Sequence, residues 1–135
     1  DRHLDELLLD LKMPVLGICL GLQLMCHYSE ENSTDCLGIF DSTVRRFPPE
    51  EKVPHMGWNT ITNLKGRLFR DIPNGSYVYF VHSYFADMTT TALSGTNYIL
   101  DFASGLEKDN YFALQFHPEK SGLIGEQILK NFLEL

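Results

Sequence analysis

A short apolar run that leads into a cysteine flanked by glycines constrains the fold of this chain more than any other feature. Residues 15–18 (Val-Leu-Gly-Ile) are apolar throughout, as expected of a strand buried on both faces of a sheet. A helix-like pattern over residues 1–12 precedes this run, and another over residues 20–28 follows it. Helix, buried strand, tight turn and helix in this order predict an α/β fold with a parallel sheet.

The rest of the chain continues as a single domain over residues 1–135, without repeats or a linker. Strands or extended segments are predicted at residues 38–47, 55–62, 77–81, 96–104 and 111–116, a short helix at 64–72, and loops or turns at 29–36, 48–52, 73–76 and 105–110. The chain ends in an amphipathic helix with Ser121 as its predicted N-cap, and the apolar side of that helix holds Ile124, Ile128, Leu129, Phe132 and Leu133.

The composition limits the function classes that fit. A net charge of −7 argues against a nucleic-acid partner, which normally requires a basic face. The three cysteines, at positions 19, 26 and 36, are odd in number and form no C-x-x-C pair, so neither a disulfide framework nor a zinc site is predicted. They favour a reducing, cytoplasmic location. Because no apolar run reaches the length of a membrane span and no signal peptide opens the chain, no membrane contact is predicted.

Cys19 lies in the pattern of a nucleophile elbow, a sharp turn between a strand and a helix. Gly17 and Gly21 flank it two residues away on each side, where small residues let the strand and the helix approach each other. The start of the helix is expected to lower the pKa of the thiol, and the N–H of Leu20 to donate to a developing oxyanion. The alternative for this motif alone is a buried structural cysteine, because free cysteine is among the most buried residue types.

His117 is the strongest candidate for a base among the five histidines. It follows the strand predicted at 111–116, and functional residues gather at strand ends in α/β sheets. Glu119 is two residues further on, so in an extended segment its carboxylate can hold the imidazole in one tautomer. Alone, His117 is better explained as a hydrogen-bonded strand-end histidine. With Cys19 and Glu119 it completes a triad, in an order that differs from the Ser-Asp-His order of α/β-hydrolases.

Two motifs at opposite ends of the chain resemble the class I (triad) glutamine amidotransferase family. They are residues 17–23 (Gly-Ile-Cys-Leu-Gly-Leu-Gln) and residues 115–121 (Gln-Phe-His-Pro-Glu-Lys-Ser). Residues 53–59 (Val-Pro-His-Met-Gly-Trp-Asn) and 79–84 (Tyr-Phe-Val-His-Ser-Tyr) further resemble one branch of that family, the glutaminase subunits of imidazole glycerol phosphate synthases. The branches that serve anthranilate, GMP and CTP synthesis lack the Pro-His-Met-Gly-Trp-Asn run.

The resemblance implies a three-layer, flavodoxin-like α/β domain with a mostly parallel central sheet. This chain would form the C-terminal two-thirds of that domain, without its usual N-terminal β-α units. A glycine-rich loop in those units supplies a second oxyanion donor, so the 135 residues alone are expected to be weakly active or inactive. The implied reaction hydrolyses L-glutamine to glutamate and ammonia without a metal or cofactor. The ammonia would pass to a (β/α)₈ synthase/cyclase subunit in histidine biosynthesis.

The resemblance also implies roles for individual residues. Cys19 would attack the glutamine amide, His117 would move the proton, and Glu119 would orient His117. Contacts with the substrate are implied for Gln23, His82, Ser83 and Tyr84. The partner interface and the passage for ammonia are implied for His55, Met56, Gly57, Trp58, Asn59 and Lys120.

Several alternatives remain open from the sequence. Trp58 can be a core aromatic residue, His82 a packed strand histidine and Gln23 a solvated helix residue. For the whole chain, the alternatives are a non-catalytic subunit that binds a synthase, a cysteine hydrolase of peptides or γ-glutamyl compounds, and the subunit of another class I amidotransferase. A binding test with different synthase partners would distinguish another class I amidotransferase. Substrate profiling would distinguish a cysteine hydrolase.

Overall fold

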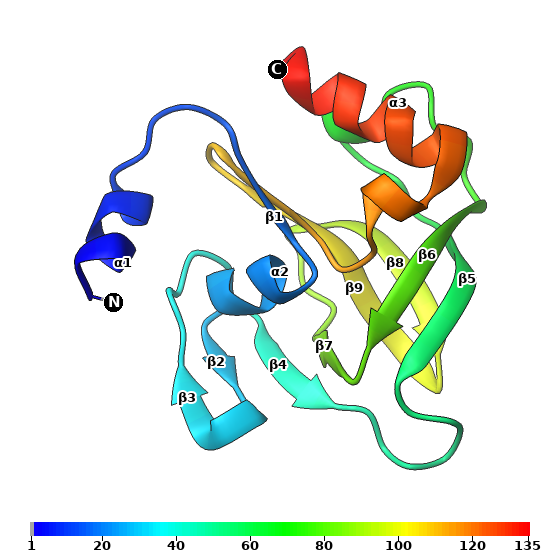
Figure 1. Ribbon diagram of the computed structural model, residues 1–135, viewed down its shortest axis with the longest axis horizontal. Coiled ribbons are helices and arrows are strands. Elements are labelled where there is room, and N and C mark those ends of the chain that lie inside the picture. Colours follow the sequence, from blue (N-terminus) through cyan, green and yellow to red (C-terminus); the bar gives the residue numbers. More distant parts are fainter. Residues whose placement is uncertain (1) are drawn as a thin grey trace.

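The computed structural model describes residues 2–135, with side chains from Asp5 onward, as an α/β structure with few helices (Figure 1). The described helices are α1 (Arg2–Leu9), α2 (Leu20–Met25) and α3 (Gly122–Leu133), and the short 3₁₀ turns are η1 (Glu31–Ser33), η2 (Arg67–Phe69) and η3 (Pro118–Lys120). The described strands are β1 (Val15–Ile18), β2 (Tyr28–Ser29), β3 (Thr34–Asp35), β4 (Thr43–Arg46), β5 (His55–Ile61), β6 (Ser76–His82), β7 (Tyr84–Ala86), β8 (Ala92–Tyr98), β9 (Leu100–Lys108) and β10 (Tyr111–Leu114). Residue 1 of the helix predicted at 1–12 lies outside the described residues.

Eight of the described strands form one mixed sheet. Its order is β1-β10-β9-β7-β4-β2-β3, and β8 pairs with β9 outside this path. The other two strands, β5 and β6, form an antiparallel ribbon that a bridge between Thr62 and Gly95 connects to β8. In Figure 1 this ribbon lies at the right, with α3 above it and α1 on the opposite side of the molecule.

The α/β class is confirmed, but the expectation of a mostly parallel sheet is wrong for the described residues. The pairs β1–β10 and β2–β4 are parallel, whereas the other described strand pairs are antiparallel. For the pairs β8–β9 and β9–β10, the reason is the length of the connections. Strands β8, β9 and β10 follow one another through turns of one and two residues. Such short turns join antiparallel neighbours, because a parallel pair requires a long crossover.

Alternate residues of β10 reach two separate hydrophobic cores. Phe112 and Leu114 pack in a core that includes Ile128 of α3. Tyr111 and Ala113 pack in a second core, which includes residues of α2. Successive strand residues point to opposite faces of a sheet. The sheet therefore lies between α3 and α2, which gives the three-layer arrangement.

Two predicted helices are shorter than the sequence pattern indicates. The helix predicted at 20–28 ends just before Cys26, which is extended. The helix predicted at 64–72 is reduced to η2, because Gly66 and Asp71 have positive φ angles of 82° and 64°, which a right-handed helix does not accommodate. Among the described helices, none combines the length and apolar character that crossing a bilayer requires.

The strand predicted at 96–104 is in fact part of a long hairpin, β8 and β9. The turn between them is at Ile99, which has a φ of 67°. A β-branched residue rarely adopts this conformation, so the sequence gives no turn signal there. Because β9 continues to Lys108, the loop predicted at 105–110 is reduced to two residues.

The C-terminal helix α3 is confirmed, with two corrections. Ser121 occupies the N-cap position, but its hydroxyl makes no capping hydrogen bond, because it bonds to the backbone of Tyr79 and His117 instead. Leu133 is 81% exposed, so it does not belong to the apolar side of the helix. Ile128, by contrast, is fully buried.

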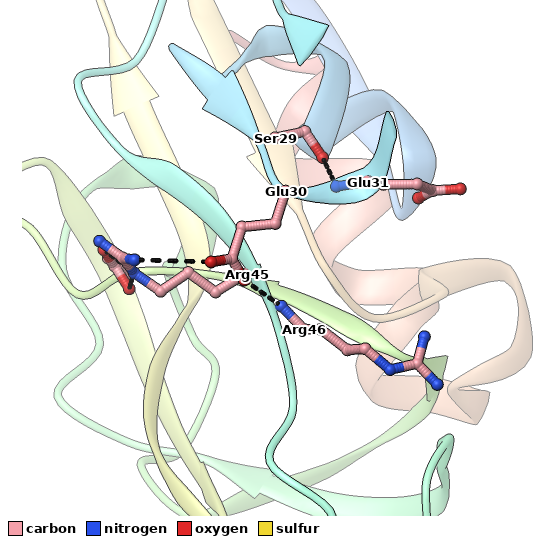
Figure 2. A network of polar contacts seen from close by, with 6 residues as sticks. Ser29, Glu30, Glu31, Arg45 and Arg46 are labelled. Atoms are coloured by element: carbon pink, nitrogen blue, oxygen red, sulfur yellow. Dashed lines mark hydrogen bonds and ion pairs between the residues drawn. The ribbon is translucent and has the colours of Figure 1, made fainter. Parts of the chain in front are cut away.

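The polar segment after α2 is attached to β4 by charged side chains (Figure 2). Glu30 Oε1 accepts a hydrogen bond from the backbone N–H of Arg46 at 2.9 Å, and its other oxygen lies 3.8 Å from Arg45. Arg45 also pairs with Asp87 at 2.8 Å. The loop predicted at 29–36 is therefore an ordered hairpin, since it contains the paired strands β2 and β3.

Candidate active site

Cys19 occupies the turn between β1 and α2, in a backbone conformation that a non-glycine residue rarely adopts. Its φ is 55° and its ψ is −103°. The N–H of Cys19 donates to the carbonyl of Leu114 at 2.7 Å, and its carbonyl accepts from the N–H of Gln23 at 3.3 Å. The strained turn is held from both sides, by β10 and by the first turn of α2. The strand–turn–helix geometry that the sequence predicts is present.

The two glycines that flank Cys19 have different surroundings. A Cβ on Gly17 would lie 2.5 Å from Met25 Sδ and 3.0 Å from the backbone of Gly21. A side chain at position 17 would therefore require Met25 and the backbone of α2 to shift. A Cβ on Gly21 would meet nothing within 4 Å. The expectation that close packing requires small residues is therefore right at position 17 and wrong at position 21.

The thiol of Cys19 lies between β6 and the segment that follows β10. Its Sγ donates to the carbonyl of Val81 at 3.8 Å and accepts from Nε2 of Gln115 at 3.7 Å. Burial raises the pKa of the thiol, and the opposing effects of the Leu20 N–H and the Gln115 amide do not offset it. The N–H at the start of the helix lowers the pKa of this thiol, as expected, but desolvation outweighs it, so the net shift is upward.

His117 and Glu119 form the pair predicted from their spacing. Nδ1 of His117 lies 3.1 Å from Oε2 of Glu119, and the two side chains are 20% and 48% exposed. The predicted reason is wrong, since the carboxylate reaches the ring through the 3₁₀ turn η3 rather than along an extended segment. A carboxylate accepts a hydrogen bond from Nδ1–H and leaves Nε2 as the nitrogen that can take a proton.

Backbone hydrogen bonds hold the His117 segment against β6. The N–H of His117 donates to the carbonyl of Tyr79 at 3.0 Å, and the N–H of Tyr79 donates to Oγ of Ser121 at 3.0 Å. The Ser121 hydroxyl in turn donates to the carbonyl of His117 at 2.6 Å. On the other side, Gly125 of α3 packs so closely on the carbonyl of Pro118 that any Cβ would clash.

The parallel pairing of β1 and β10 brings Cys19 and His117 to one edge of the sheet. Both residues follow the carboxyl end of their strand, and the two strand ends are paired. Glu119 and Lys120, both exposed on η3, act on the Cys19 thiol electrostatically. Among the described side chains, no hydrogen bond joins the thiol to His117, because the thiol bonds to β6 and to the segment after β10.

Of the four predicted substrate contacts, Gln23 and His82 are buried, and Ser83 and Tyr84 are half-buried. Gln23 is 8% exposed, and its Nε2 donates to the carbonyl of Tyr84 at 3.1 Å and to Oε1 of Gln115 at 3.3 Å. The alternative that Gln23 is a solvated helix residue is therefore wrong. His82 is 5% exposed, so the alternative of a packed strand histidine is correct for its side chain. The contacts of Gln23 and of the backbone around Ser83 with a substrate stay predictions.

The residues of β5 that are predicted to face a partner divide between the two faces of that strand. Met56 and Trp58 are 58% and 55% exposed, so Trp58 is not a core residue. His55 is 4% exposed and points inward with Asn59, as strand alternation requires. Gly57 lies between His55 and Asn59 along the strand and has a φ of 127°. The exposed face of β5 is available to a partner, and the interface itself stays a prediction.

Sequence reasoning missed two features of this site. His55 and His82 pair across the β5–β6 ribbon, with Nδ1 of the first 3.0 Å from Nε2 of the second. Burial lowers the pKa of His55 to about 4 and that of His82 to about 3, so both rings are neutral at pH 7. Gln115 contacts the Cys19 thiol, although the sequence indicates no role for it beyond its place in the motif at 115–121.

The described residues provide the parts of a nucleophilic site. Cys19 supplies a thiol, His117 a ring nitrogen that can take a proton, and Glu119 the carboxylate that holds the other nitrogen. This set of groups suits acyl transfer through a covalent intermediate. Among the described residues, no cluster of three or more His, Cys, Asp or Glu side chains is arranged to hold a metal ion.

Comparisons with known proteins agree with this chemistry. The family described as glutamine amidotransferase class-I matches residues 2–135. The imidazole glycerol phosphate synthase subunit HisH of Bacteroides fragilis is 57% identical over 138 residues, which cover 100% of this chain and 70% of that protein. The subunit of the same name from Yersinia pseudotuberculosis is 47% identical over 137 residues, covering 99% of this chain and 70% of that protein.

A solved structure agrees on the fold. A glutamine amidotransferase from Thermotoga maritima matches with a TM-score of 0.62 at 21% sequence identity. The match covers 98% of this chain, which spans 52% of the other. At this level of identity the likeness shows the three-layer α/β fold alone.

Proposed function

Because this chain belongs to the class I glutamine amidotransferase family, we propose that it is the glutaminase subunit of an imidazole glycerol phosphate synthase. In this role it hydrolyses L-glutamine to glutamate and ammonia. The observation that carries the proposal is the 57% identity over the whole chain to a subunit of that synthase. The proposed catalytic residues, Cys19, His117 and Glu119, lie at one edge of the sheet, which supports it.

The first half of the proposed reaction forms a thioester. The sulfur of Cys19 attacks the side-chain amide carbon of glutamine, and the thiol proton goes to Nε2 of His117. Because burial raises the pKa of the thiol, the attack requires such a base. The N–H of Leu20 donates to the oxyanion of the tetrahedral intermediate. The carbon–nitrogen bond then breaks, and the nitrogen leaves as ammonia with the proton that His117 returns.

The second half releases glutamate. His117 takes a proton from a water molecule, whose oxygen attacks the thioester carbon. The carbon–sulfur bond breaks, and the Cys19 sulfur recovers its proton from His117. Throughout both halves, Glu119 holds Nδ1 of His117 at 3.1 Å and stabilises the charged ring. No step requires a metal or cofactor.

The proposed partner is a (β/α)₈ synthase/cyclase subunit, which forms a heterodimer with this chain and uses the ammonia in histidine biosynthesis. The exposed Met56 and Trp58 on β5 and the exposed Lys120 on η3 support a contact face beside the site. The proposed location is the cytoplasm, which the three free cysteines support. Residues 1–135 are proposed to act as one domain, because both described cores share β10.

Substrate contacts complete the proposal. Glutamine would bind against the backbone of Ser83 and Tyr84 and against Gln23. Since Gln23 Nε2 already donates to Tyr84 and Gln115, a substrate contact at Gln23 requires it to exchange one of these bonds.

Covalent labelling with an electrophilic glutamine analogue, 6-diazo-5-oxo-L-norleucine, tests the proposal. We expect a single adduct in the intact mass, no adduct in Cys19→Ala, and normal labelling in the matched control Cys36→Ala, whose thiol is also only partly buried. Glutamate release is measured in parallel, with and without the cyclase subunit. The rate without that partner also tests the expected weak activity of the 135 residues alone.

Two outcomes would reject the proposal. A folded protein that forms no adduct and releases no glutamate with the cyclase subunit present has a binding role only. Faster cleavage of peptides or other γ-glutamyl compounds than of glutamine would identify a cysteine hydrolase of another class.

A further inference from the structure

A continuous chain of hydrogen bonds leads away from the Cys19 thiol, with its Gln23–Gln115 and His55–His82 links buried. Nε2 of Gln115 donates to the sulfur at 3.7 Å, and Oε1 of Gln115 accepts from Nε2 of Gln23 at 3.3 Å. Nε2 of Gln23 also donates to the carbonyl of Tyr84 at 3.1 Å. The same carbonyl lies 2.7 Å from Nδ1 of His82. The chain therefore runs from the thiol to the end of β6.

The chain continues across the β5–β6 ribbon. Nε2 of His82 lies 3.0 Å from Nδ1 of His55, and Nε2 of His55 lies 3.3 Å from Nδ2 of Asn59. Nδ2 of Asn59 also donates to the carbonyl of Asn97 at 2.9 Å. The outer end of the chain is therefore on β5, the strand whose opposite face carries the exposed Trp58.

Backbone carbonyls fix the direction of these hydrogen bonds. A carbonyl oxygen only accepts, so the Tyr84 carbonyl requires a proton on Nδ1 of His82. Because the buried rings are neutral, Nε2 of His82 carries no proton and accepts from Nδ1–H of His55. The carbonyl of Asn97 requires the amide nitrogen of Asn59, rather than its oxygen, to face it. The same nitrogen then donates to Nε2 of His55. Both imidazoles are thereby held as the Nδ1–H tautomer.

The same rule applies at the thiol end. Because the Tyr84 carbonyl can only accept, it must face Nε2 of Gln23 rather than Oε1. Nε2 of Gln23 also donates to Gln115, so the Gln115 atom that faces it must be Oε1. A flipped Gln115 would bring two amide nitrogens together and turn its oxygen toward the sulfur of Cys19. Gln115 is 0% exposed, so solvent does not compensate for such a mismatch. The fixed direction delivers an N–H to the sulfur.

We propose that His55 and His82 are positioning residues, which hold the Tyr84 carbonyl and, through Gln23, orient the Gln115 amide so that it donates to the sulfur of Cys19. The inference rests on the proposed function, in which this sulfur is the nucleophile. An N–H donated to sulfur stabilises the thiolate relative to the thiol. Loss of the histidine pair therefore makes the sulfur less reactive and leaves the triad intact.

Two substitutions at His82 separate positioning from packing. In His82→Asn, the side-chain amide nitrogen takes the place of Nδ1 and keeps the donor to Tyr84, but the rest of the ring is lost. His82→Phe keeps a ring among the surrounding Phe47, Phe80 and Phe102 but has no donor. Positioning predicts that His82→Asn is the more reactive variant, whereas a purely structural role predicts that His82→Phe is.

The readout is the second-order rate of Cys19 alkylation by iodoacetamide, with the adduct located by mass spectrometry. We expect alkylation about tenfold slower in His82→Phe than in the wild type, the size of a lost hydrogen bond to a charged group, and close to the wild-type rate in His82→Asn. The glutaminase reaction with the cyclase subunit should show the same order in kcat, with KM little changed.

Alkylation needs no glutamine site, so its result is independent of the proposed function. If the wild type releases no glutamate, the proposed function fails while the order of alkylation rates still tests the histidine chain. Equal rates in the two folded variants, or a faster rate in His82→Phe, overturn the positioning role.

A measurement on the unsubstituted protein does not depend on how the variants fold. Two-bond ¹H–¹⁵N correlation spectra of the imidazoles report which ring nitrogen carries the proton. We expect both His55 and His82 as the neutral Nδ1–H tautomer at pH 7. An Nε2–H tautomer at either ring breaks the direction of the chain and overturns the inference.

Discussion

His117 and the His55–His82 pair both bring imidazole rings to the candidate active site, and they differ in what faces Nδ1. At His117 the partner is the carboxylate of Glu119, 3.1 Å away and 48% exposed. In the pair the partners are another imidazole and the carbonyl of Tyr84, and both rings are buried. The residue type is the same in the two regions, but the charge and the exposure of the surroundings are not.

This difference assigns the two regions different chemistry. A carboxylate partner stabilises an imidazolium, whereas burial without a counter-charge disfavours it. Burial accordingly lowers the pKa of His55 to about 4 and of His82 to about 3. His117 therefore remains the proposed base, while the neutral, buried pair can only direct hydrogen bonds.

The largest expected effect comes from removing the imidazole of His117, the proposed proton acceptor. His117→Asn should lower kcat for glutamine hydrolysis by about 10²- to 10⁴-fold, the usual contribution of a general base. His27→Asn removes an exposed histidine and is the matched control. A His117→Asn variant that keeps kcat within about tenfold of the wild type would assign proton transfer to another group.

Neutralising the carboxylate partner tests what makes His117 different from the pair. Glu119→Gln should lower kcat by about 10²-fold, less than the roughly 10⁴-fold cost of losing a buried triad carboxylate, because this side chain is half exposed. Glu126→Gln, on the exposed side of α3, is the control. Equal kcat values for the two variants would show that the carboxylate does not orient His117.

Backbone packing beneath the His117 segment gives a further way to disturb that region alone. In Gly125→Ala the new methyl group meets the carbonyl of Pro118, so we expect η3 to shift and the protein to lose about 3 kcal/mol of stability. Gly21→Ala, which meets nothing within 4 Å, should not be destabilised. Urea denaturation measures both, and equal midpoints would contradict the close packing of α3 on η3.

The buried pair should appear in the pH dependence of stability. The pKa of each ring is lower in the folded protein than the usual 6.5, so the unfolded chain binds more protons and stability falls as the pH falls below about 6.5. Between pH 7 and pH 5, before most carboxylates titrate, each ring should cost on the order of 2 kcal/mol, so the loss for the pair should be about 4 kcal/mol.

Denaturation at the two pH values should show a smaller loss in the double variant His55→Gln, His82→Gln. The control His27→Gln, which removes an exposed ring, should keep the loss of the wild type. If the double variant loses as much stability as the wild type between pH 7 and pH 5, the pair does not remain neutral in the folded protein.

The parts of the site that sequence predicts are those set by local pattern. The run at residues 15–18 predicts β1, and Gly17 lies where α2 approaches that strand closely. The contact between His117 and Glu119 also follows from their spacing, although a 3₁₀ turn rather than an extended segment produces it. These features depend on a few consecutive residues, so a single sequence contains the information for them.

The parts that sequence does not predict depend on contacts between distant segments. The pairing of His55 with His82 requires the register of β5 against β6, which no local pattern specifies. The raised pKa of the Cys19 thiol depends on burial by β6 and the segment after β10. The antiparallel hairpin at β8 and β9 turns at Ile99, a residue type that gives no turn signal.

The smallest expected effect comes from an ion pair that lies outside the candidate active site, which serves as a contrast to His117 and Glu119. Arg45 and Asp87 lie 2.8 Å apart, closer than His117 and Glu119. Arg45 is on β4 and Asp87 follows β7, so the pair is separated from β1 and β10 along the sheet path. Exposed ion pairs contribute little, because water and salt screen them. Arg45→Ala should therefore leave kcat and the urea midpoint unchanged, with Lys108→Ala as an exposed control on β9. If kcat falls in Arg45→Ala but not in Lys108→Ala, the charge on β4 affects the reaction at the candidate site. Position at the carboxyl ends of β1 and β10 would then not be what gives a charged pair its effect on catalysis.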